Sequence, residues 1–320
     1  MKKLTIGIGA IAVALSMSGG ASAQNVTMTG ASCFPKNYYF SFPFEKMVPE
    51  INAANTGVTV NYVGGAPAIG SPFTLVQQTS KGVYGLVSCT GAYYQNVLPE
   101  ADVFKLVEYS HEELRERGAF DYIDKLHQEK GLKYLAKIIG YTPFHLYLNK
   151  KIDKPDLTGL HLRVAPIYTA FFQALGATTQ QSNFAQVYSY MENGTVVGYG
   201  WPVTGLAPDW HKVTKYRVDP GFYDTDINVM MNLDTWNKLG DDQKKSVTDI
   251  SLKYERDARN FEKDVATARA KQAEQGIETI TFTGADADKW LKTAREAGWA
   301  NLMKNSPEHG AKLRELFAKN

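Results

Sequence analysis

Arg163 is the residue of this 320-residue chain whose surroundings most clearly indicate binding chemistry. It lies in a short apolar segment between Leu162 and Val164. A guanidinium is rarely buried without a partner, because removing its charge from water is costly. Its planar fork of N–H groups matches a carboxylate through two parallel hydrogen bonds. The residues alone leave two interpretations open, a site for a carboxylate ligand or a structural salt bridge to an Asp or Glu elsewhere in the chain.

Aromatic side chains are concentrated near the ends of the strands that the sequence predicts. Such rings can stack on a planar or apolar ligand, or they can be ordinary core residues. Tyr168, Phe171 and Phe172 recur at helical spacing, and we interpret these three as core. The aromatic candidates for ligand contact are Phe34, Tyr93, Tyr94, Tyr199 and Trp201, with Trp201 preferred.

Polar candidates accompany Arg163 in two places. His161 alternates onto the same strand face as Arg163, where it either approaches the ligand or serves as a structural histidine. Asp224 and Asp226 follow an aromatic pair at 222–223 and either contact a ligand hydroxyl or cap a strand. Asp224 is the one that we take as a candidate ligand contact.

The sequence contains no short motif for catalysis or metal binding. C-x-x-C, H-E-x-x-H and G-x-S-x-G are all missing, so we expect no catalytic residue, no metal and no cofactor. Cys33 and Cys89 are the two cysteines of the chain. In an oxidising compartment they form either a disulfide or two buried thiols, because the sequence does not determine their separation.

The first hundred residues read as alternating strands and helices, which predicts a mostly parallel, doubly wound sheet. Ligands bind such sheets at the carboxyl ends of the strands, which here are residues 32–37 and 88–94. The expected strands are 25–31, 58–63 and 83–87, and the expected helices are 38–55 and 72–81.

The remainder of the chain predicts a second unit and a long helix. Residues 241–273 are highly charged and lack Gly and Pro, and as a helix they would be about 50 Å long. Such a helix either spans two lobes or forms a surface arm. Helices are also expected over 111–137, 168–175, 184–192, 233–239 and 286–318, and strands over 138–149, 160–164, 196–199 and 227–232.

The N-terminus has the form of a bacterial secretory signal peptide. Lys2 and Lys3 precede an apolar stretch, and the small residues 21–23 predict cleavage after Ala23 and export to the periplasm. The remaining chain carries no formal net charge, because two lysines and no acids are removed from a total of +2. A neutral chain offers no electrostatic basis for binding nucleic acid.

Several ordered motifs resemble one transport family. Gly159-Leu160-His161-Leu162-Arg163-Val164 is followed by Tyr168-x-x-Phe171-Phe172-x-Ala174-Leu175-Gly176-Ala177, then Phe184-x-x-Val187-Tyr188 and Asn193-Gly194-Thr195-Val196-Val197-Gly198. This series is similar to DctP-type extracytoplasmic binding proteins of TRAP (tripartite ATP-independent periplasmic) transporters. The resemblance implies two lobes that close over a ligand, an arginine at position 163 that pairs with the substrate carboxylate, and small and large membrane subunits as partners.

Three departures from the family pattern bear on the ligand. Residues 197–202 lack the acidic groups of the family, and Trp201 stands where a polar residue is usual. Residues 140–145 contain no second arginine, and the loop at 165–167 after Arg163 is short. Fewer cationic anchors and more aromatic surface favour a small organic monocarboxylate, such as an aromatic or 2-oxo acid.

These observations together predict an α/β, two-lobed periplasmic-binding-protein fold with mixed, mostly parallel sheets and a lobe-spanning helix. We expect a signal peptide at 1–23, lobe I at 24–146 plus 227–265, and lobe II at 147–226 plus 266–320. The expected function is capture of the acid by a non-enzymatic transport component. Alternatives are a C4-dicarboxylate or sugar acid as ligand, another importer or a sensor as partner, and, least favoured, a secreted hydrolase.

Overall fold

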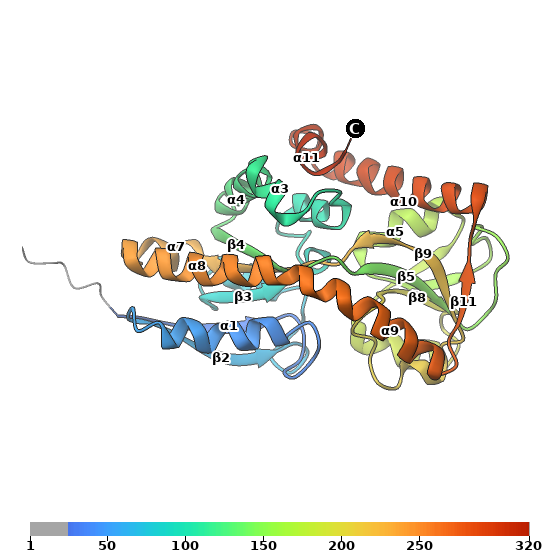
Figure 1. Ribbon diagram of the computed structural model, residues 1–320, viewed down its shortest axis with the longest axis horizontal. Coiled ribbons are helices and arrows are strands. Elements are labelled where there is room, and N and C mark those ends of the chain that lie inside the picture. Colours follow the sequence, from blue (N-terminus) through green and yellow to red (C-terminus); the bar gives the residue numbers. More distant parts are fainter. Residues whose placement is uncertain (1–24, 320) are drawn as a thin grey trace, which may run out of the picture.

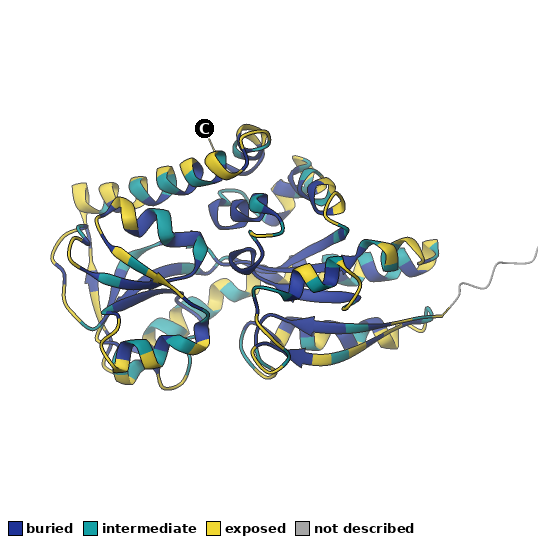
Figure 2. Cartoon of the chain, turned by 180° about the vertical axis from the view of Figure 1, so that it is seen from behind, coloured by how far each residue is buried: buried dark blue, intermediate teal, exposed yellow. Residues whose placement is uncertain are grey.

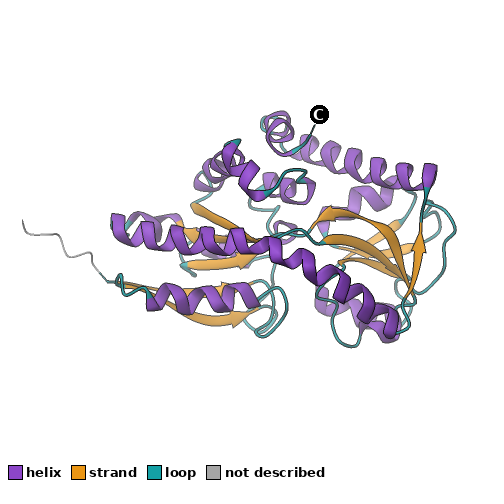
Figure 3. Ribbon diagram, in the orientation of Figure 1, coloured by secondary structure: helices purple, strands orange, loops and turns teal. Residues whose placement is uncertain are grey.

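The computed structural model describes residues 25–319, which form two mixed β-sheets with helices on their faces (Figures 1 and 3). The predicted signal peptide lies outside the described residues. The first sheet has the strand order β2-β1-β3-β10-β4, in which β1, β2 and β3 are parallel and β10 is antiparallel to both of its neighbours. Its strands are β1 (Val26–Ser32), β2 (Val58–Gly65), β3 (Leu86–Cys89), β4 (Leu132–Ile139) and β10 (Ile227–Asn232).

The helices of the first sheet follow from apolar residues at helical intervals. α1 (Phe42–Ala53) buries Phe44, Met47, Val48 and Ile51 and packs on β2. The other helices here are α2 (Leu75–Ser80), the 3-10 helices η1 (Gly91–Tyr93) and η2 (Pro99–Leu106), α3 (His111–Glu116) and α4 (Ala119–Gln128). The expectation of a helix over the whole of 111–137 was wrong, because residues 132–139 form strand β4.

The second sheet has the order β11-β9-β5-β8-β6-β7. β6 lies parallel to β7 and β8, whereas β5 is antiparallel to β8 and β9. The sequence did not indicate β7, β9 or β11; β9 includes a Pro-Gly pair, and β11 is short and mostly exposed. The strands are β5 (Pro143–Leu148), β6 (His161–Val164), β7 (Thr178–Gln181), β8 (Gly198–Pro202), β9 (Tyr216–Asp224) and β11 (Glu278–Thr281).

The chain passes between the sheets at residues 140–142 and again at 225–226, so the expected single strand over 138–149 is two strands in different sheets. A continuous helical run also joins them, made of α8 (Asp241–Asp257), η5 (Ala258–Phe261) and α9 (Glu262–Glu274). α8 packs on β4 and α1, and Gln272 of α9 donates to the carbonyl of Val203 at 2.8 Å, in the second unit. The predicted lobe-spanning helix is therefore confirmed (Figure 1).

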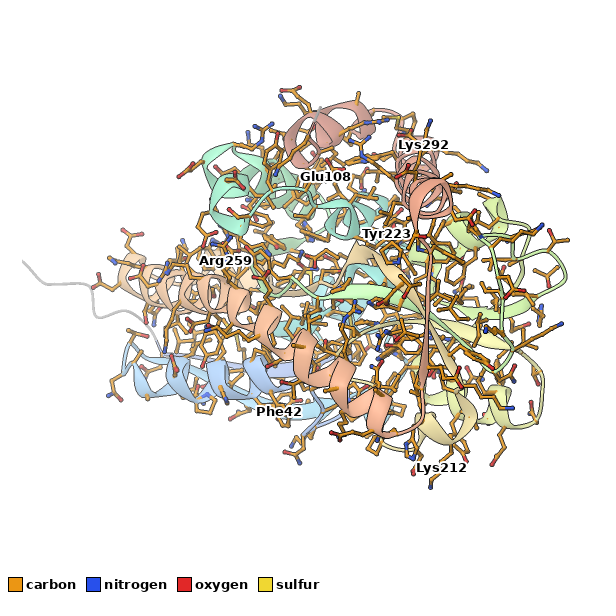
Figure 4. All side chains as sticks on the ribbon, turned by 45° about the vertical axis from the view of Figure 1, so that its right-hand side comes forward. Phe42, Glu108, Lys212, Tyr223, Arg259 and Lys292 are labelled. Atoms are coloured by element: carbon orange, nitrogen blue, oxygen red, sulfur yellow. A yellow bond between two sulfur atoms is a disulfide. The ribbon has the colours of Figure 1, made fainter. Side chains whose placement is uncertain are left out.

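The two C-terminal helices, α10 (Gly284–Asn305) and α11 (Gly310–Phe317), lie across the top of both units (Figure 1). α10 packs on α5 (Pro166–Ala174) and β9 of the second unit and on η2 of the first, whereas α11 packs on η2 and α4. Tyr223, which is labelled in Figure 4, donates to the carbonyl of Ala294 in α10 at 2.7 Å and so ties this helix to β9. The remaining short helices are η3 (Phe184–Gln186), α6 (Val187–Glu192), η4 (Trp210–Val213) and α7 (Leu233–Asn237).

Burial follows the layers. The strands are mostly buried, and the helices present alternating buried and exposed faces, as Figure 2 shows. Because apolar burial is the main stabilising contribution to folding, each sheet with its covering helices supplies a core.

Candidate functional site

A narrow cavity lies where the two sheets face each other. Its interior volume is only about 30 Å³, so it can admit a small organic molecule only when the two units move apart. Loops that follow β1 and β3 form one side, and β5, β8 and the start of α5 form the other. The lining residues are Phe34, Phe40, Thr90, Ala92, Tyr93, Phe144, Ala165, Ile167, Tyr168, Trp201, Pro202, Thr225, Asp226 and Ile227.

Three of the predicted aromatic contacts line this cavity. Phe34 and Tyr93 come from the first unit with ring centroids 5.6 Å apart, and Trp201 from the second lies 6.5 Å from Phe34. The indole N–H of Trp201 donates to the carbonyl of Gly205 at 3.0 Å, which holds the ring in place. The wall is thus an aromatic surface that both units build.

Arg163 is fully buried on β6, immediately behind this wall. Its Nε donates to Ser182 Oγ at 3.2 Å, one terminal nitrogen donates to the Tyr168 hydroxyl at 2.9 Å, and the other donates to the Ser182 carbonyl. Within residues 25–319, none of the ion pairs includes Arg163. The charge of this guanidinium is therefore left without a carboxylate partner in the part of the chain that the structure describes.

Two tyrosines connect Arg163 to the cavity. Tyr168 accepts from Arg163 and donates onward to the Gly200 carbonyl at 2.7 Å. Burial raises the pKa of Tyr93 to about 12, although the nearby positive charge of Arg163 lowers it. Burial also raises the pKa of Tyr168, so both phenols remain protonated at neutral pH. The single O–H of Tyr168 is used by Gly200, which leaves Tyr93 as the phenol that can donate to an anion.

Tyr168 was expected to be plain core, and this expectation was incomplete. It is buried as predicted, but it also lines the cavity and bonds Arg163. Gly200 permits this arrangement, because a Cβ at that position would lie 2.7 Å from the Tyr168 ring. Tyr168 follows Arg163 by five residues and lies just inside the helix that starts after the strand. This short separation was the sequence signal that could have indicated a contact between the two side chains.

Among residues 25–319, Asp226 is the one acidic or basic side chain that lines the cavity. Its Oδ2 accepts from the Gly91 amide and from the Asn228 side chain, both at 2.6 Å, and its Oδ1 accepts from the Thr90 hydroxyl at 3.3 Å. Burial raises the pKa of this carboxyl to about 6, against the opposing effect of these donors and of Lys137. The sequence analysis considered both Asp224 and Asp226 and took Asp224 as the candidate ligand contact.

Asp224, the selected neighbour, lies outside the cavity. Its carboxylate pairs with the buried Lys137 at 2.6 Å and accepts from the Thr142 amide at 3.1 Å. Burial raises the pKa of Asp224, and Lys137 opposes the shift. This pair joins β4 to the end of β9, close to where the chain passes between the sheets.

The other predicted contacts also lie away from the cavity. Tyr94 is hydrogen-bonded to His127 at 3.3 Å inside the first unit. Tyr199 is hydrogen-bonded to Thr214 at 2.8 Å and stacks on Tyr147. His161 is half-buried at the start of β6 and is hydrogen-bonded to Thr178 at 2.8 Å.

Cys33 and Cys89 form a disulfide with a Cα separation of 4.9 Å. The bond joins the ends of the parallel strands β1 and β3. The following residues, Phe34 and Thr90, both line the cavity, so the disulfide holds these two loops against each other. Among residues 25–319, no cluster of three His, Cys, Asp or Glu side chains could hold a metal ion.

The family model for bacterial extracellular solute-binding proteins, family 7 (DctP), matches residues 44–305. The chain belongs to the DctP family. A solute-binding protein of Roseobacter denitrificans is 22% identical over 91% of both chains, and its solved structure, with bound L-galactonate, has a TM-score of 0.75 over 92% of this chain and 99% of that one. No helix within residues 25–319 is long and apolar enough to cross a membrane.

Solved TRAP binding proteins share the DctP fold at low sequence identity. A protein of Desulfovibrio salexigens with bound orotic acid has a TM-score of 0.80 at 17% identity, over 91% of this chain and 97% of that one. DctP7 of Bordetella pertussis, which binds pyroglutamic acid, has a TM-score of 0.77 at 15% identity, over 92% and 100%. The DctP family consists of extracellular solute-binding proteins, so this chain is a solute-binding component of transport and not an enzyme.

Proposed function

We propose that this DctP protein captures a small organic monocarboxylate, with aromatic or 2-oxo acids favoured, and presents it to the small and large membrane subunits of a TRAP transporter. One observation carries the proposal: Arg163 is fully buried beside the cavity and has only neutral partners among the described residues. A buried charge without a counter-ion is costly, and a ligand carboxylate would supply that counter-ion.

The remaining N–H groups of Arg163 are sufficient for this role. A guanidinium has five N–H groups, and three are used by Ser182 and Tyr168. One N–H on each terminal nitrogen is therefore left for the nearby Tyr93 hydroxyl and for an incoming carboxylate. The compounds in the solved relatives described above, orotic acid, pyroglutamic acid and L-galactonate, all contain a carboxyl group, which is consistent with this chemistry.

The cavity walls favour a compact ligand with an apolar or aromatic body. Phe34, Tyr93 and Trp201 present ring faces and edges, on which a planar ligand can stack. No cationic side chain lines the cavity within the described part of the chain, and Arg163 lies behind Tyr168 of its wall, which is why one carboxylate is favoured over two.

Entry to the cavity requires the two units to separate. Side chains of the loop after β1 cross to the second unit, where Tyr38 donates to the Gly205 carbonyl and Tyr39 donates to Asp264 at 2.8 Å. Lys105 of η2 likewise donates to the Ile167 carbonyl in α5. We infer that these contacts break when the lobes open and re-form over bound ligand, with the lobes divided near residues 142, 226 and 261, where the chain passes from one unit to the other.

The test is thermal unfolding of the protein without residues 1–23, the segment that we propose is cleaved after Ala23. The panel contains aromatic acids, 2-oxo acids, hydroxy acids, C4-dicarboxylates and sugar acids. A ligand at a thousand times its Kd adds about 4 kcal/mol of stability, which shifts the midpoint by several degrees. We expect a monocarboxylate to give the largest shift.

Arg163→Gln should abolish that shift, and Arg163→Lys should restore part of it, because lysine keeps the charge but not the planar fork. Arg256→Gln, at an exposed position of α8, is the control and should bind like the parent protein. A larger shift with dicarboxylates or sugar acids would replace the monocarboxylate assignment. Unchanged binding by Arg163→Gln would exclude Arg163 as the carboxylate partner.

A further inference from the structure

Asp226 is a carboxylate placed inside a cavity that we propose receives another carboxylate. Like charges repel, so a residue of this kind weakens acid binding unless it serves a different part of the ligand. Its side chain is 1% exposed and forms none of the ion pairs found within residues 25–319, because the nearby Lys137 pairs with Asp224. The position of Asp226 therefore calls for a functional explanation.

The hydrogen bonds of Asp226 leave one oxygen incompletely used. An ionised carboxylate offers about four acceptor positions. Oδ2 receives two bonds of 2.6 Å, from Gly91 and Asn228, whereas Oδ1 receives one bond of 3.3 Å, from Thr90. Because Asp226 lines the cavity, the free acceptor position on Oδ1 is available to a bound molecule.

A purely structural role does not require a carboxylate at this position. Asp226 holds the start of η1 through the Gly91 amide, and Gly91 is needed there because a Cβ would lie 2.5 Å from the Ala101 carbonyl oxygen. An asparagine would accept the same bonds from Gly91 and Asn228 without a buried charge. Burial raises the pKa of Asp226 to about 6, so at neutral pH the protein keeps an ionised group in an unfavourable environment.

We propose that Asp226 accepts a hydrogen bond from the ligand, and that the ligand is consequently an acid with a hydroxyl or N–H donor in addition to the carboxylate bound by Arg163. This inference rests on the proposed capture of a monocarboxylate and replaces the preference for 2-oxo acids, which considered only Arg163 and the aromatic wall. An ionised Asp226 has no proton to give to a keto oxygen, so hydroxy acids and N–H acids are favoured over 2-oxo acids of the same skeleton.

The two anchors also come from opposite sides of the cavity. Arg163 lies on β6 of the second sheet, and Asp226 immediately precedes β10 of the first sheet. A ligand that bonds both groups would hold the two units together. A site built to bond a donor discriminates strongly against analogues that lack it, because the buried acceptor is then left unpaired.

The experiment compares acids that differ only at the carbon next to the carboxylate. Mandelate, phenylglycine, phenylglyoxylate and phenylacetate form one set, and lactate, alanine, pyruvate and propanoate form a smaller set. Binding to the protein without residues 1–23 is measured by calorimetry at pH 8, where Asp226 is ionised. In the set that binds, we expect the hydroxy or amino member to bind at least tenfold more tightly than the 2-oxo and unsubstituted members.

Asp226→Asn is the informative variant. Its amide oxygen can still accept from Gly91 and Asn228, but its NH₂ group replaces Oδ1 and offers the ligand a donor instead of an acceptor. We expect the preference for donors to fall below threefold or to reverse in favour of the 2-oxo acid. Asp249→Asn, an exposed carboxylate of α8, is the matched control and should leave the order of affinities unchanged. The circular dichroism spectrum and melting temperature of each variant verify folding.

The outcomes separate this inference from the function on which it rests. Tighter binding of the 2-oxo or unsubstituted acids by the parent protein would overturn the role of Asp226 and leave acid binding intact. A donor preference that persists in Asp226→Asn would do the same. Failure of every acid in both sets and in the wider panel to bind would overturn the proposed function together with this inference.

Discussion

Two buried arginines in the second sheet have opposite surroundings. Arg217 on β9 bonds Asp219 at 3.2 Å, Gln272 at 2.8 Å and Thr279 at 3.0 Å, so its charge is balanced within the protein. Arg163 on β6 has only hydroxyl and carbonyl partners. The first arrangement ties β9 to α9 and β11, whereas the second leaves an unbalanced charge behind the cavity wall.

The two aspartates where the chain passes between the sheets differ in the same way: one is paired with a cation and the other, within residues 25–319, is not. Asp224 pairs with Lys137, while Asp226, two residues later, has no cationic partner among the described residues and lines the cavity. The difference teaches that burial alone does not identify a binding residue. What distinguishes the candidate site is buried charge that the protein leaves unbalanced.

The largest expected effect is a difference in stability between two single variants, each of which replaces one of these arginines by glutamine, measured without ligand. Arg217→Gln removes one partner of a buried pair and should lower the free energy of unfolding by about 3–5 kcal/mol. Arg163→Gln should change it by about 1 kcal/mol or less, because the lost hydrogen bonds are offset by removing an unpaired buried charge. Urea denaturation measures both, and equal losses would contradict the distinction.

The next effect concerns Asp226 and pH. Burial raises its folded-state pKa to about 6 from 3.8, so the ionised form is disfavoured in the folded protein. The penalty is full above pH 6, diminishes as pH falls, and is absent below about pH 4, where both states are protonated. Asp226→Asn should therefore stabilise the ligand-free protein by up to about 3 kcal/mol at pH 8.

Measuring the melting temperature of Asp226→Asn from pH 4 to 8 checks this expectation. The stabilisation should shrink steadily towards pH 4. A variant that is less stable than the parent at pH 8 would show that the carboxylate supports the fold.

The hydroxyls of Tyr168 and Tyr147 lie near Arg163 and Arg217 respectively, so removing each one compares the surroundings of the two arginines. Tyr168 accepts from Arg163, and Tyr147 accepts from Gln272, the partner of Arg217, at 3.1 Å. Loss of one buried hydroxyl costs about 1 kcal/mol of stability in either case. Only Tyr168→Phe should also weaken acid binding, by about fivefold, since it disturbs Arg163. Calorimetry with the tightest acid of the panel separates the two variants.

The smallest effect is expected at a contact between the lobes. Tyr39→Phe removes a partly exposed bond to Asp264 and should cost about 0.5 kcal/mol or less. We expect acid affinity to fall about twofold, with no change in the order of preference among acids. A changed order would mean that this contact shapes the cavity and does not merely assist closure.

Much of the fold could be predicted from local patterns. The βαβαβ order at the N-terminus and the charged helix at 241–273 rest on hydrophobic period and on the absence of Gly and Pro, which are properties of the sequence itself. The charged composition of residues 111–137 predicts one helix over that range. Its last residues belong instead to β4, where the buried Lys137 pairs with Asp224 at the end of β9.

The candidate site was predictable to a lesser extent. Burial of Arg163 followed from its apolar neighbours, and Phe34, Tyr93 and Trp201 followed from their places at strand ends. Tyr94 and Tyr199 occupy similar places but face the interior of their own units. A strand end does not specify which of two adjacent side chains faces the cavity, because that depends on the packing of the opposite unit.

By itself, the sequence determined the family, the α/β class, the long charged helix and the burial of Arg163, because each depends on residue types and short-range spacing. Only the tertiary structure decided that Arg163 lacks a carboxylate partner among residues 25–319, that Asp224 is neutralised by Lys137, and that Asp226 lines the cavity. Charge balance is a property of groups brought together from distant parts of the chain. It is the reason that the site emerged from the fold and not from any single motif.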